Sequence, residues 1–414
     1  MGKRKSNQRN SRIQPAASID EPHEPDLARA FDLVMQLMAI PGKTAQERQV
    51  ADFITEHLRK AGAPASAIHT DSAHRRTPVP GQIGNLALRL PGTMRAPRRL
   101  LSAHLDTVPI CVGSQPVREG ELVRSANPKS GLGADNRAGC AVLLCAAIEI
   151  LTRKLPHPPL TFCWFVQEET GLNGSRHLTK SLLANPQLAF NFDGGAPTKL
   201  TIGATGGYRM LIEIEGIASH AGGAPEAGVS AIAIASLAIA DLHQSGWHGD
   251  IARDGKHGTS NVGYISGGEA TNVVTDHVTL KAEARSHDPK FRKRIIREME
   301  QAFQRAAKEV RNMDGECGKV KITGHLDYES FLLKTTEPCV DVAGQAIRSI
   351  GEEPQHAIAN GGVDANWLTA HGIPAVTLGC GQKYQHMVSE LLNVKEFELA
   401  CRIGLRLATA TELK

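Results

Sequence analysis

The sequence predicts an α/β protein in which a larger domain, built on a mainly parallel sheet, is interrupted by a smaller α+β domain. Short apolar runs without alternation are typical of strands that are covered on both faces. Such runs occur early in the chain and return near its C-terminus, after a middle segment with a different pattern. They lie at residues 100–103, 160–166, 188–192 and 373–378.

Two helices are expected before the first of these strands. Residues 26–39 carry apolar side chains at helical spacing, and a Pro-Gly pair then ends the pattern. Thr44 and Glu47 have the spacing of a capping box, which predicts that a second helix begins there and ends near Gly62. A further helical pattern at residues 138–151 supplies the crossover that parallel strands need.

The pattern changes in the middle of the chain. An alternating strand is followed by a helix of small residues, two more strands and a charged amphipathic helix, at residues 210–214, 230–242, 261–265, 278–284 and 290–310. These elements predict two helices packed on an antiparallel sheet. We therefore expect a disordered basic tail, a discontinuous larger domain and an inserted smaller domain, at residues 1–22, 23–206 with 327–414, and 207–326, respectively.

Composition excludes several classes of protein. The 414 residues are 41% hydrophobic and 22% charged, as in ordinary globular proteins. The net charge of +4 comes from the tail, which holds five basic residues: Lys3, Arg4, Lys5, Arg9 and Arg12. Without them, 42 basic residues face 43 acidic ones, so we expect no nucleic-acid partner.

Nothing in the sequence predicts a membrane partner or a disulfide framework. No apolar stretch is long enough to cross a bilayer, and the tail lacks the apolar centre of a secretory signal, which predicts a cytoplasmic protein. The eight cysteines lack paired zinc-ribbon spacing, and several lie inside apolar runs. Reduced thiols in the core are therefore expected.

Potential metal ligands or catalytic carboxylates follow each of the four apolar runs. Open α/β sheets bind ligands at the carboxyl ends of their strands, so these side chains should meet at one edge. Asp135 lies just before the crossover helix and faces the same region. The expected set is His104, Asp106, Asp135, Glu168, Glu169, Asp193 and His386.

Each member of this set also has an ordinary explanation when it is taken alone. Asp135 has the position of a helix N-cap, and Asp193 precedes two glycines as turn residues do. Glu168 and Glu169 would face water if the strand simply ended there. Together, however, two imidazoles with several carboxylates match a pair of divalent ions bridged by one carboxylate, and imidazole suits zinc better than magnesium.

The order of the motifs supports this interpretation. The chain contains HLDTVP, GLGADNRAG, VQEETGLNGS, NFDGG, ASHAG, GGVDANWL and GIPAVTLGCGQKYQHMVSE. In this order, over nearly the whole chain after the tail, it resembles the zinc peptidase superfamily that contains peptidase T, the aminoacylases and the carboxypeptidase G type enzymes, and it is most similar to peptidase T.

The resemblance implies a role for each residue of the metal site. His104 and Asp193 would bind one zinc ion, Glu169 and His386 the other, and Asp135 would bridge the two. Cobalt or manganese could replace zinc.

It also implies catalytic and substrate-binding roles. Asp106 would support His104, and Glu168 would be the general base. The smaller domain would act as a lid that carries His220 to the reacting carbonyl, and Asn261 and Arg285 would hold substrate termini. For Arg285, a structural salt bridge is an equally good explanation.

The expected activity is hydrolysis of small peptides by a two-zinc aminopeptidase of the peptidase T type, acting on tripeptides. A homodimer formed through the smaller domain is one arrangement that the resemblance allows. An N-acyl amino acid deacylase or a carboxypeptidase is the enzymatic alternative, and a metal-retaining peptide-binding protein is the non-enzymatic one. Asn136 differs from close peptidase T relatives, which often carry an acid there.

Overall fold

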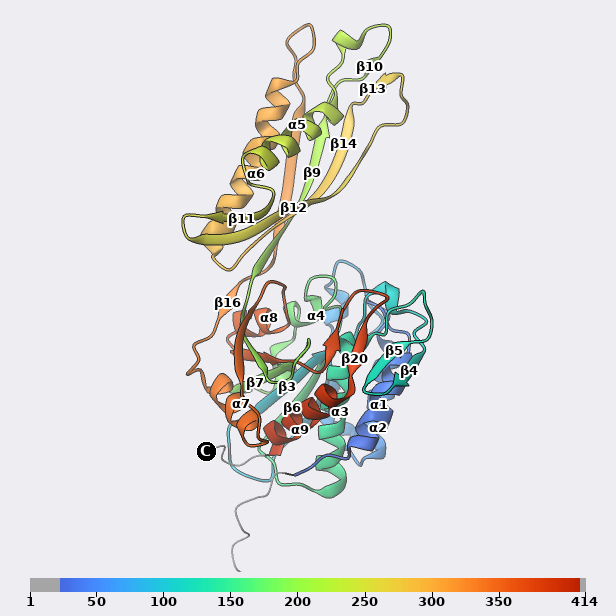
Figure 1. Ribbon diagram of the computed structural model, residues 1–414, viewed down its shortest axis with the longest axis vertical. Helices are drawn as coiled ribbons and strands as arrows, with labels where there is room; N and C mark the ends of the chain where they lie inside the picture. The colour runs from blue at the N-terminus through green and yellow to red at the C-terminus, as the bar shows by residue number, and fades with distance from the viewer. Residues whose placement is uncertain (1–22, 410–414) are drawn as a thin grey trace, which may run out of the picture.

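The computed structural model describes residues 23–409, so the expected basic tail at residues 1–22 lies outside the described part. The molecule has a larger α/β unit and a smaller unit at one end of it (Figure 1). No helix within the described range is long and apolar enough to cross a membrane. All eight cysteines are free thiols, and all except Cys317 are buried.

Two helices open the described chain. Helix α1 (Leu27–Ala39) begins where the Asp26 side chain accepts a hydrogen bond from the Arg29 N–H group. Helix α2 (Arg48–Lys60) has Glu47 at its N-cap position, and no side chain caps it.

The predicted capping box between Thr44 and Glu47 is therefore wrong. The Glu47 carboxylate accepts hydrogen bonds from the Ala45 and Gln167 N–H groups instead, at 2.7 and 3.2 Å. The Thr44 hydroxyl donates to Asp106 Oδ2 at 2.6 Å. Both side chains thus join this helix start to segments that are distant in the sequence.

A nine-stranded mixed sheet forms the centre of the larger unit. Its four central strands follow the order β6-β3-β7-β18 and are parallel, and they correspond to the four apolar runs of the sequence. The flanking strands pair mostly antiparallel, except for β17, which is parallel to β8. The strands are β1 (Ile68–Thr70), β2 (Leu86–Leu90), β3 (Arg99–His104), β6 (Leu160–Phe165), β7 (Leu188–Phe192), β8 (Lys199–Ala204), β16 (Phe331–Leu332), β17 (Gln355–Ala359) and β18 (Ala375–Leu378).

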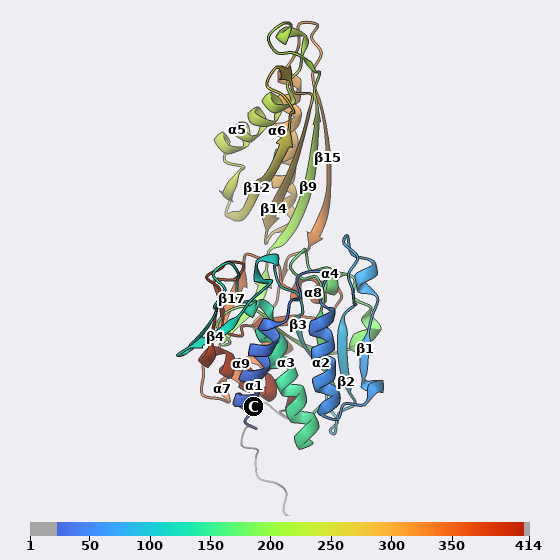
Figure 2. The same ribbon diagram turned by 90° about the vertical axis from the view of Figure 1, so that its right-hand side faces the viewer.

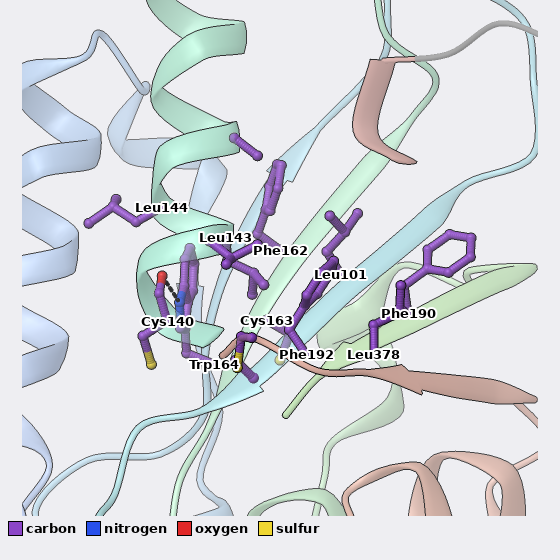
Figure 3. Packing of buried hydrophobic residues seen from close by; sticks show 14 of the residues in the cluster. Leu101, Cys140, Leu143, Leu144, Phe162, Cys163, Trp164, Phe190, Phe192 and Leu378 are labelled. Atoms are coloured by element: carbon purple, nitrogen blue, oxygen red, sulfur yellow. Dashed lines mark hydrogen bonds between the residues drawn. The ribbon is translucent and has the colours of Figure 1, made fainter. Parts of the chain in front are cut away.

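Apolar side chains of the sheet and its helices form one core. Helix α3 (Ala134–Arg153) packs against α1, α2, strand β3 and the C-terminal helix α9 (Val394–Thr409). Figure 3 shows part of this core, where the Trp164 indole donates a hydrogen bond to the Cys140 carbonyl at 3.4 Å. The remaining helices of this unit are α4 (Asn173–Arg176), α7 (Pro338–Arg348) and α8 (Ala365–Ala370).

A small four-stranded sheet lies beside this core. It joins the hairpin of β4 (Pro116–Glu119) and β5 (Leu122–Ser125) to β20 (Leu391–Asn393) and β19 (Gln382–Lys383). The loop between β19 and β20 carries His386. The pairing of β19 with β20, and of β20 with β5, attaches both ends of that loop to the larger unit.

The smaller unit contains an antiparallel sheet in the order β11-β12-β14-β9-β15. Helices α5 (Ala231–Gln244) and α6 (Pro289–Glu309) cover one face of it and leave the other open (Figure 2). Strands β9 and β15 connect it to the larger unit. The strands are β9 (Gly206–Glu215), β11 (Gly249–Arg253), β12 (Lys256–Gly267), β14 (His277–Ser286) and β15 (Lys319–Tyr328), with a separate pair, β10 (Ser219–His220) and β13 (Val273–Val274).

Candidate metal centre

Three parallel strands deliver acidic and imidazole side chains to one edge of the central sheet. His104 is the last residue of β3, the Glu168-Glu169 pair follows β6, and Asp193 comes directly after β7. Because β3 pairs in parallel with both β6 and β7, their carboxyl ends lie side by side. Asp135, in the first turn of α3, lies at the same edge beside His104.

Asp135 lies between the two imidazoles of the site. Its Oδ1 atom is 3.1 Å from His104 Nε2, and its Oδ2 atom is 3.5 Å from His386 Nε2. His386 Nε2 also lies 2.9 Å from Glu169 Oε2. One carboxylate thus offers one oxygen to each imidazole, which is the arrangement of a bridging ligand.

The possible ligands form two overlapping groups that share His104. The ligand atoms of His104, Asp135 and Glu169 lie within 4.8 Å of one another, and so do those of His104, Glu168 and Asp193. The structure therefore brings together every member of the set expected at this edge, including His386 through its contacts with Asp135 and Glu169.

Asp106 is completely buried and organises the residues around it. Its Oδ1 atom accepts a hydrogen bond from the Glu168 N–H group at 2.9 Å and lies 3.4 Å from His104 Nδ1. Its Oδ2 atom accepts from the Glu169 N–H group at 3.2 Å and from the Thr44 hydroxyl. Asp106 therefore fixes both the His104 ring and the backbone of the two glutamates.

The proton affinities of the site show that its negative charge is poorly solvated. Burial, with Asp135 next, raises the pKa of Glu169 to about 7, and burial raises the pKa values of Glu168 and Asp193 well above their usual range. Hydrogen bonds to Asp135 and Glu169 raise the pKa of His386 to about 10. Bound cations would offset this concentration of acidic groups.

The donor set fits a pair of transition-metal ions. Imidazole nitrogens and carboxylate oxygens are the ligands of zinc sites that keep a position open for chemistry. Glu169 Oε1 is buried and has no hydrogen-bond partner in the part of the chain that the structure describes. A metal ion would satisfy such an orphaned acceptor.

The family described as Peptidase family M20/M25/M40 matches residues 100–410. The chain belongs to this family. The larger unit of this M20 peptidase therefore holds a possible metal site at the carboxyl ends of its parallel strands.

The relatives of this M20 peptidase include both curated sequences and solved structures. The uncharacterised protein YqjE of Bacillus subtilis is 29% identical over 370 residues, which cover 89% of this chain and 94% of that protein. The structure of a tripeptidase from Staphylococcus aureus is 28% identical with a TM-score of 0.83, over 94% of this chain and 99% of that one. The structure of aminopeptidase PepT from Bacillus cereus is 29% identical with a TM-score of 0.78, over 93% and 98%.

These similarities confirm the predicted fold class and the resemblance to peptidase T. A peptidase T from Escherichia fergusonii is 25% identical over 301 residues. The M20 peptidase is thus an α/β protein with a larger and a smaller unit, as its tripeptidase and aminopeptidase relatives are.

The residues of the smaller unit lie apart from the cluster of this M20 peptidase. His220 ends β10, at the end of the smaller unit that is farthest from the larger one (Figure 1). Its Nδ1 atom accepts hydrogen bonds from the Gly222 and Gly223 N–H groups at 3.1 and 2.9 Å. A single copy of the chain therefore does not bring His220 to the candidate metal centre.

The two expected substrate contacts have different surroundings. Asn261, on β12, lines a cavity of 530 Å³ on the sheet of the smaller unit. The Arg285 guanidinium, on β14, donates two hydrogen bonds to Glu283, at 2.9 and 3.0 Å. The salt-bridge interpretation of Arg285 is thus the one that the side chain adopts here.

Sequence reasoning missed Glu390, which positions Asp135. This side chain is 1% exposed, and its two oxygens accept hydrogen bonds from the Asp135 and Gly133 N–H groups at 2.9 and 2.7 Å. The one sequence feature that points to Glu390 is its position four residues after His386. That position does not indicate that its carboxylate binds the backbone near Asp135.

We expect Glu390→Gln to lower the free energy of unfolding by about 1–3 kcal/mol, because the amide leaves one of the two N–H groups facing another donor. Metal affinity should fall as well, since Asp135 loses part of its support. Urea unfolding and metal titration check both effects. Glu121→Gln is the control, since this exposed glutamate pairs with Lys395 nearby. Equal stability of the two variants would contradict the assigned role.

Proposed function

We propose that this peptidase is a two-zinc exopeptidase that removes residues from the N-terminus of small peptides, as peptidase T does. The observation that carries the proposal is the cluster around Asp135, with an imidazole at each of its oxygens. The tripeptidase and aminopeptidase structures support the substrate class, because each aligns with more than nine-tenths of this chain.

The residues near Asp135 would hold the metal. His104 and Asp193 would bind one zinc ion, Glu169 and His386 the other, and Asp135 both, with cobalt or manganese as substitutes. When bound, such a pair polarises the scissile carbonyl and lowers the pKa of a water molecule. The protein's contribution is to keep the ligands in place, which Asp106 and Glu390 do through buried hydrogen bonds.

Glu168 would be the general base. Its Oε2 atom lies 4.0 Å from His104 Nε2, and Glu168 belongs to the second ligand group with His104 and Asp193. Neighbouring cations lower the pKa of a carboxyl group, so Glu168 would be ionised in the loaded site despite its burial. It would accept the proton of the attacking water at Oε2 and deliver it to the leaving amine, which becomes the new N-terminus of the shortened peptide.

We further propose that His220 acts on the substrate of a second copy of the chain, because β10, which carries it, lies at the end of the smaller unit that is farthest from the larger one (Figure 1). Mixing the inactive variants His220→Ala and Glu168→Gln should then restore part of the activity, since some mixed dimers hold one complete site. Activity that stays at the level of the separate variants after subunit exchange would contradict this arrangement.

We expect metal binding to release protons and to strengthen as the pH rises. In the metal-free site the pKa of His386 is about 10, so this imidazole is protonated at neutral pH and must lose its proton to bind a metal. The neighbouring carboxylates, Glu168 foremost, outweigh burial and raise the pKa of the His104 ligand well above its usual value as well. The apparent affinity should therefore rise by about tenfold or more per pH unit between pH 7 and 9. Below pH 7 the dependence should be steeper, because Glu169, with a pKa of about 7, also takes up a proton.

Calorimetric titration with zinc in buffers of different ionisation enthalpy measures this release. Proton uptake, or an affinity that is independent of pH, would contradict the proposed role of His386.

A peptide panel tests the proposed function. The zinc-loaded protein should release the N-terminal residue of free tripeptides and should lose this activity when the N-terminus is acetylated. Release of the C-terminal residue would identify a carboxypeptidase, and hydrolysis of N-acetyl amino acids alone would identify a deacylase. Binding without turnover across the panel would indicate a peptide-binding protein.

A further inference from the structure

A second polar cleft lies at the edge of the larger unit, outside the candidate metal centre. It has a volume of 860 Å³ and is lined by β1, the start of α2, the loop at residues 71–84 and residues around 179–182. Strand β1 is the edge strand of the central sheet, and Figure 2 shows it at the side of the larger unit. The volume is in the range of small-molecule sites.

Three arginines face this cleft without acidic partners. Arg48, Arg75 and Arg89 line it, and none of them forms an ion pair within the described range. The Arg75 guanidinium has no hydrogen-bond partner there either. Arg48 donates to the Gln82 carbonyl. Arg89 donates to the Ser181 carbonyl at 3.3 Å and contacts the His69 ring at 2.6 and 2.8 Å. Each guanidinium therefore keeps donors that the protein does not use.

Asp71 is the one carboxylate of the lining, and neighbouring backbone N–H groups and one side-chain amide already donate hydrogen bonds to it. Its Oδ1 atom accepts hydrogen bonds from the Ala73 and Asn85 N–H groups, both at 3.0 Å. Its Oδ2 atom accepts from the Asn85 amide at 3.0 Å and from the Thr179 N–H group at 3.1 Å. Asp71 therefore shapes the cleft and does not pair with the arginines.

The two histidines of the cleft add no positive charge, and the nearby arginines help to lower their pKa values. Burial, and then Arg89, lowers the pKa of His69, while burial, and then Arg75, lowers that of His74. Both rings are therefore neutral near pH 7. His74 Nδ1 is buried and has no hydrogen-bond partner in the described residues, so this nitrogen is not exposed to the cleft.

From this cleft we infer a binding site for a small molecule that carries a phosphate group. Guanidinium forks match phosphate oxygens, and the Thr70, Ser72, Thr179 and Ser181 hydroxyls of the lining can donate to the same anion. Ile83 and Leu182 are the apolar side chains of the lining, so a hydrophobic ligand finds little surface here. The lining of this cleft includes none of the residues of the candidate metal centre.

Titration calorimetry on the full-length, zinc-loaded protein tests the inference, with inorganic phosphate, pyrophosphate and glycerol phosphate as probes in a chloride buffer. We expect saturable binding of at least one probe. Arg75→Gln should weaken it about tenfold or more, and the double variant with Arg89→Gln further, because each lost guanidinium removes a charge-assisted contact. Arg59→Gln, an exposed change in α2 with the same loss of charge, should leave the affinity unchanged.

The same titration after chelation separates this cleft from the metal centre. Binding that persists without zinc and depends on Arg75 supports the cleft. Binding that is lost when zinc is removed, and that is unaffected by Arg75→Gln, places phosphate on the metal ions and overturns the inference. Absence of saturable binding, or equal weakening by Arg59→Gln, also overturns it. The selectivity between inorganic phosphate and glycerol phosphate shows whether the free anion or an ester is preferred.

Discussion

Replacing Glu168 by Gln should lower kcat by about a thousandfold, while the protein should keep its fold and its metal. The amide has the same shape as the carboxylate but cannot accept the water proton, so the contribution of general base catalysis disappears. Because the Glu168 N–H group is held by Asp106, the backbone of the loop should not move. KM should change little, since the variant loses an interaction that is formed in the transition state.

Steady-state kinetics on a free tripeptide, with metal content measured on the same sample, checks this prediction. The exposed Glu56, which pairs with Lys60 on α2, provides a matched control as Glu56→Gln. Activity within about tenfold of the wild type in Glu168→Gln would exclude Glu168 as the base.

Replacing Asp135 by Asn should abolish tight binding of both metals and reduce activity to the level of the chelated wild type. Each oxygen of Asp135 faces a different imidazole, so a neutral amide removes the shared charge and presents a donor to one of the two ions. The wild type should gain about 4 kcal/mol of apparent stability when free zinc is a thousandfold above its Kd, and Asp135→Asn should lose most of this gain.

Thermal unfolding with and without zinc, together with elemental analysis, measures the effect of Asp135→Asn. The exposed Asp52 on α2, replaced by Asn, is the control. If Asp135→Asn held two ions per chain with a normal zinc-dependent shift in Tm, the bridging role would be wrong.

Much of the fold could be predicted because its central strands are buried on both faces. Such strands leave continuous apolar runs, and the end of each run indicates where polar side chains emerge. This rule predicts that His104, Glu168, Glu169 and Asp193 lie at one edge of the sheet, and the structure places them there. The antiparallel flanking strands of the sheet, such as β2 and β8, left weaker patterns and were not predicted.

The supporting contacts could not be predicted, because they join segments that are far apart in the chain. Thr44 and Glu47 have the spacing of a helix cap, yet their side chains bind Asp106 and the Gln167 backbone. Glu390 binds backbone groups 255 and 257 residues away. Local spacing carries no information on such partners. The position of His220 depends on how the two units are arranged, which the motif ASHAG does not encode.

The place of β18 in the central sheet has a consequence for biosynthesis. This strand lies between β7 and β8, although the whole smaller unit and helices α7 and α8 separate it from β8 in the chain. During translation the smaller unit is complete while β7 and β8 still lack their shared neighbour. We therefore expect the smaller unit to fold first on the ribosome, and the half-built sheet, with open strand edges, to be the state most prone to aggregate.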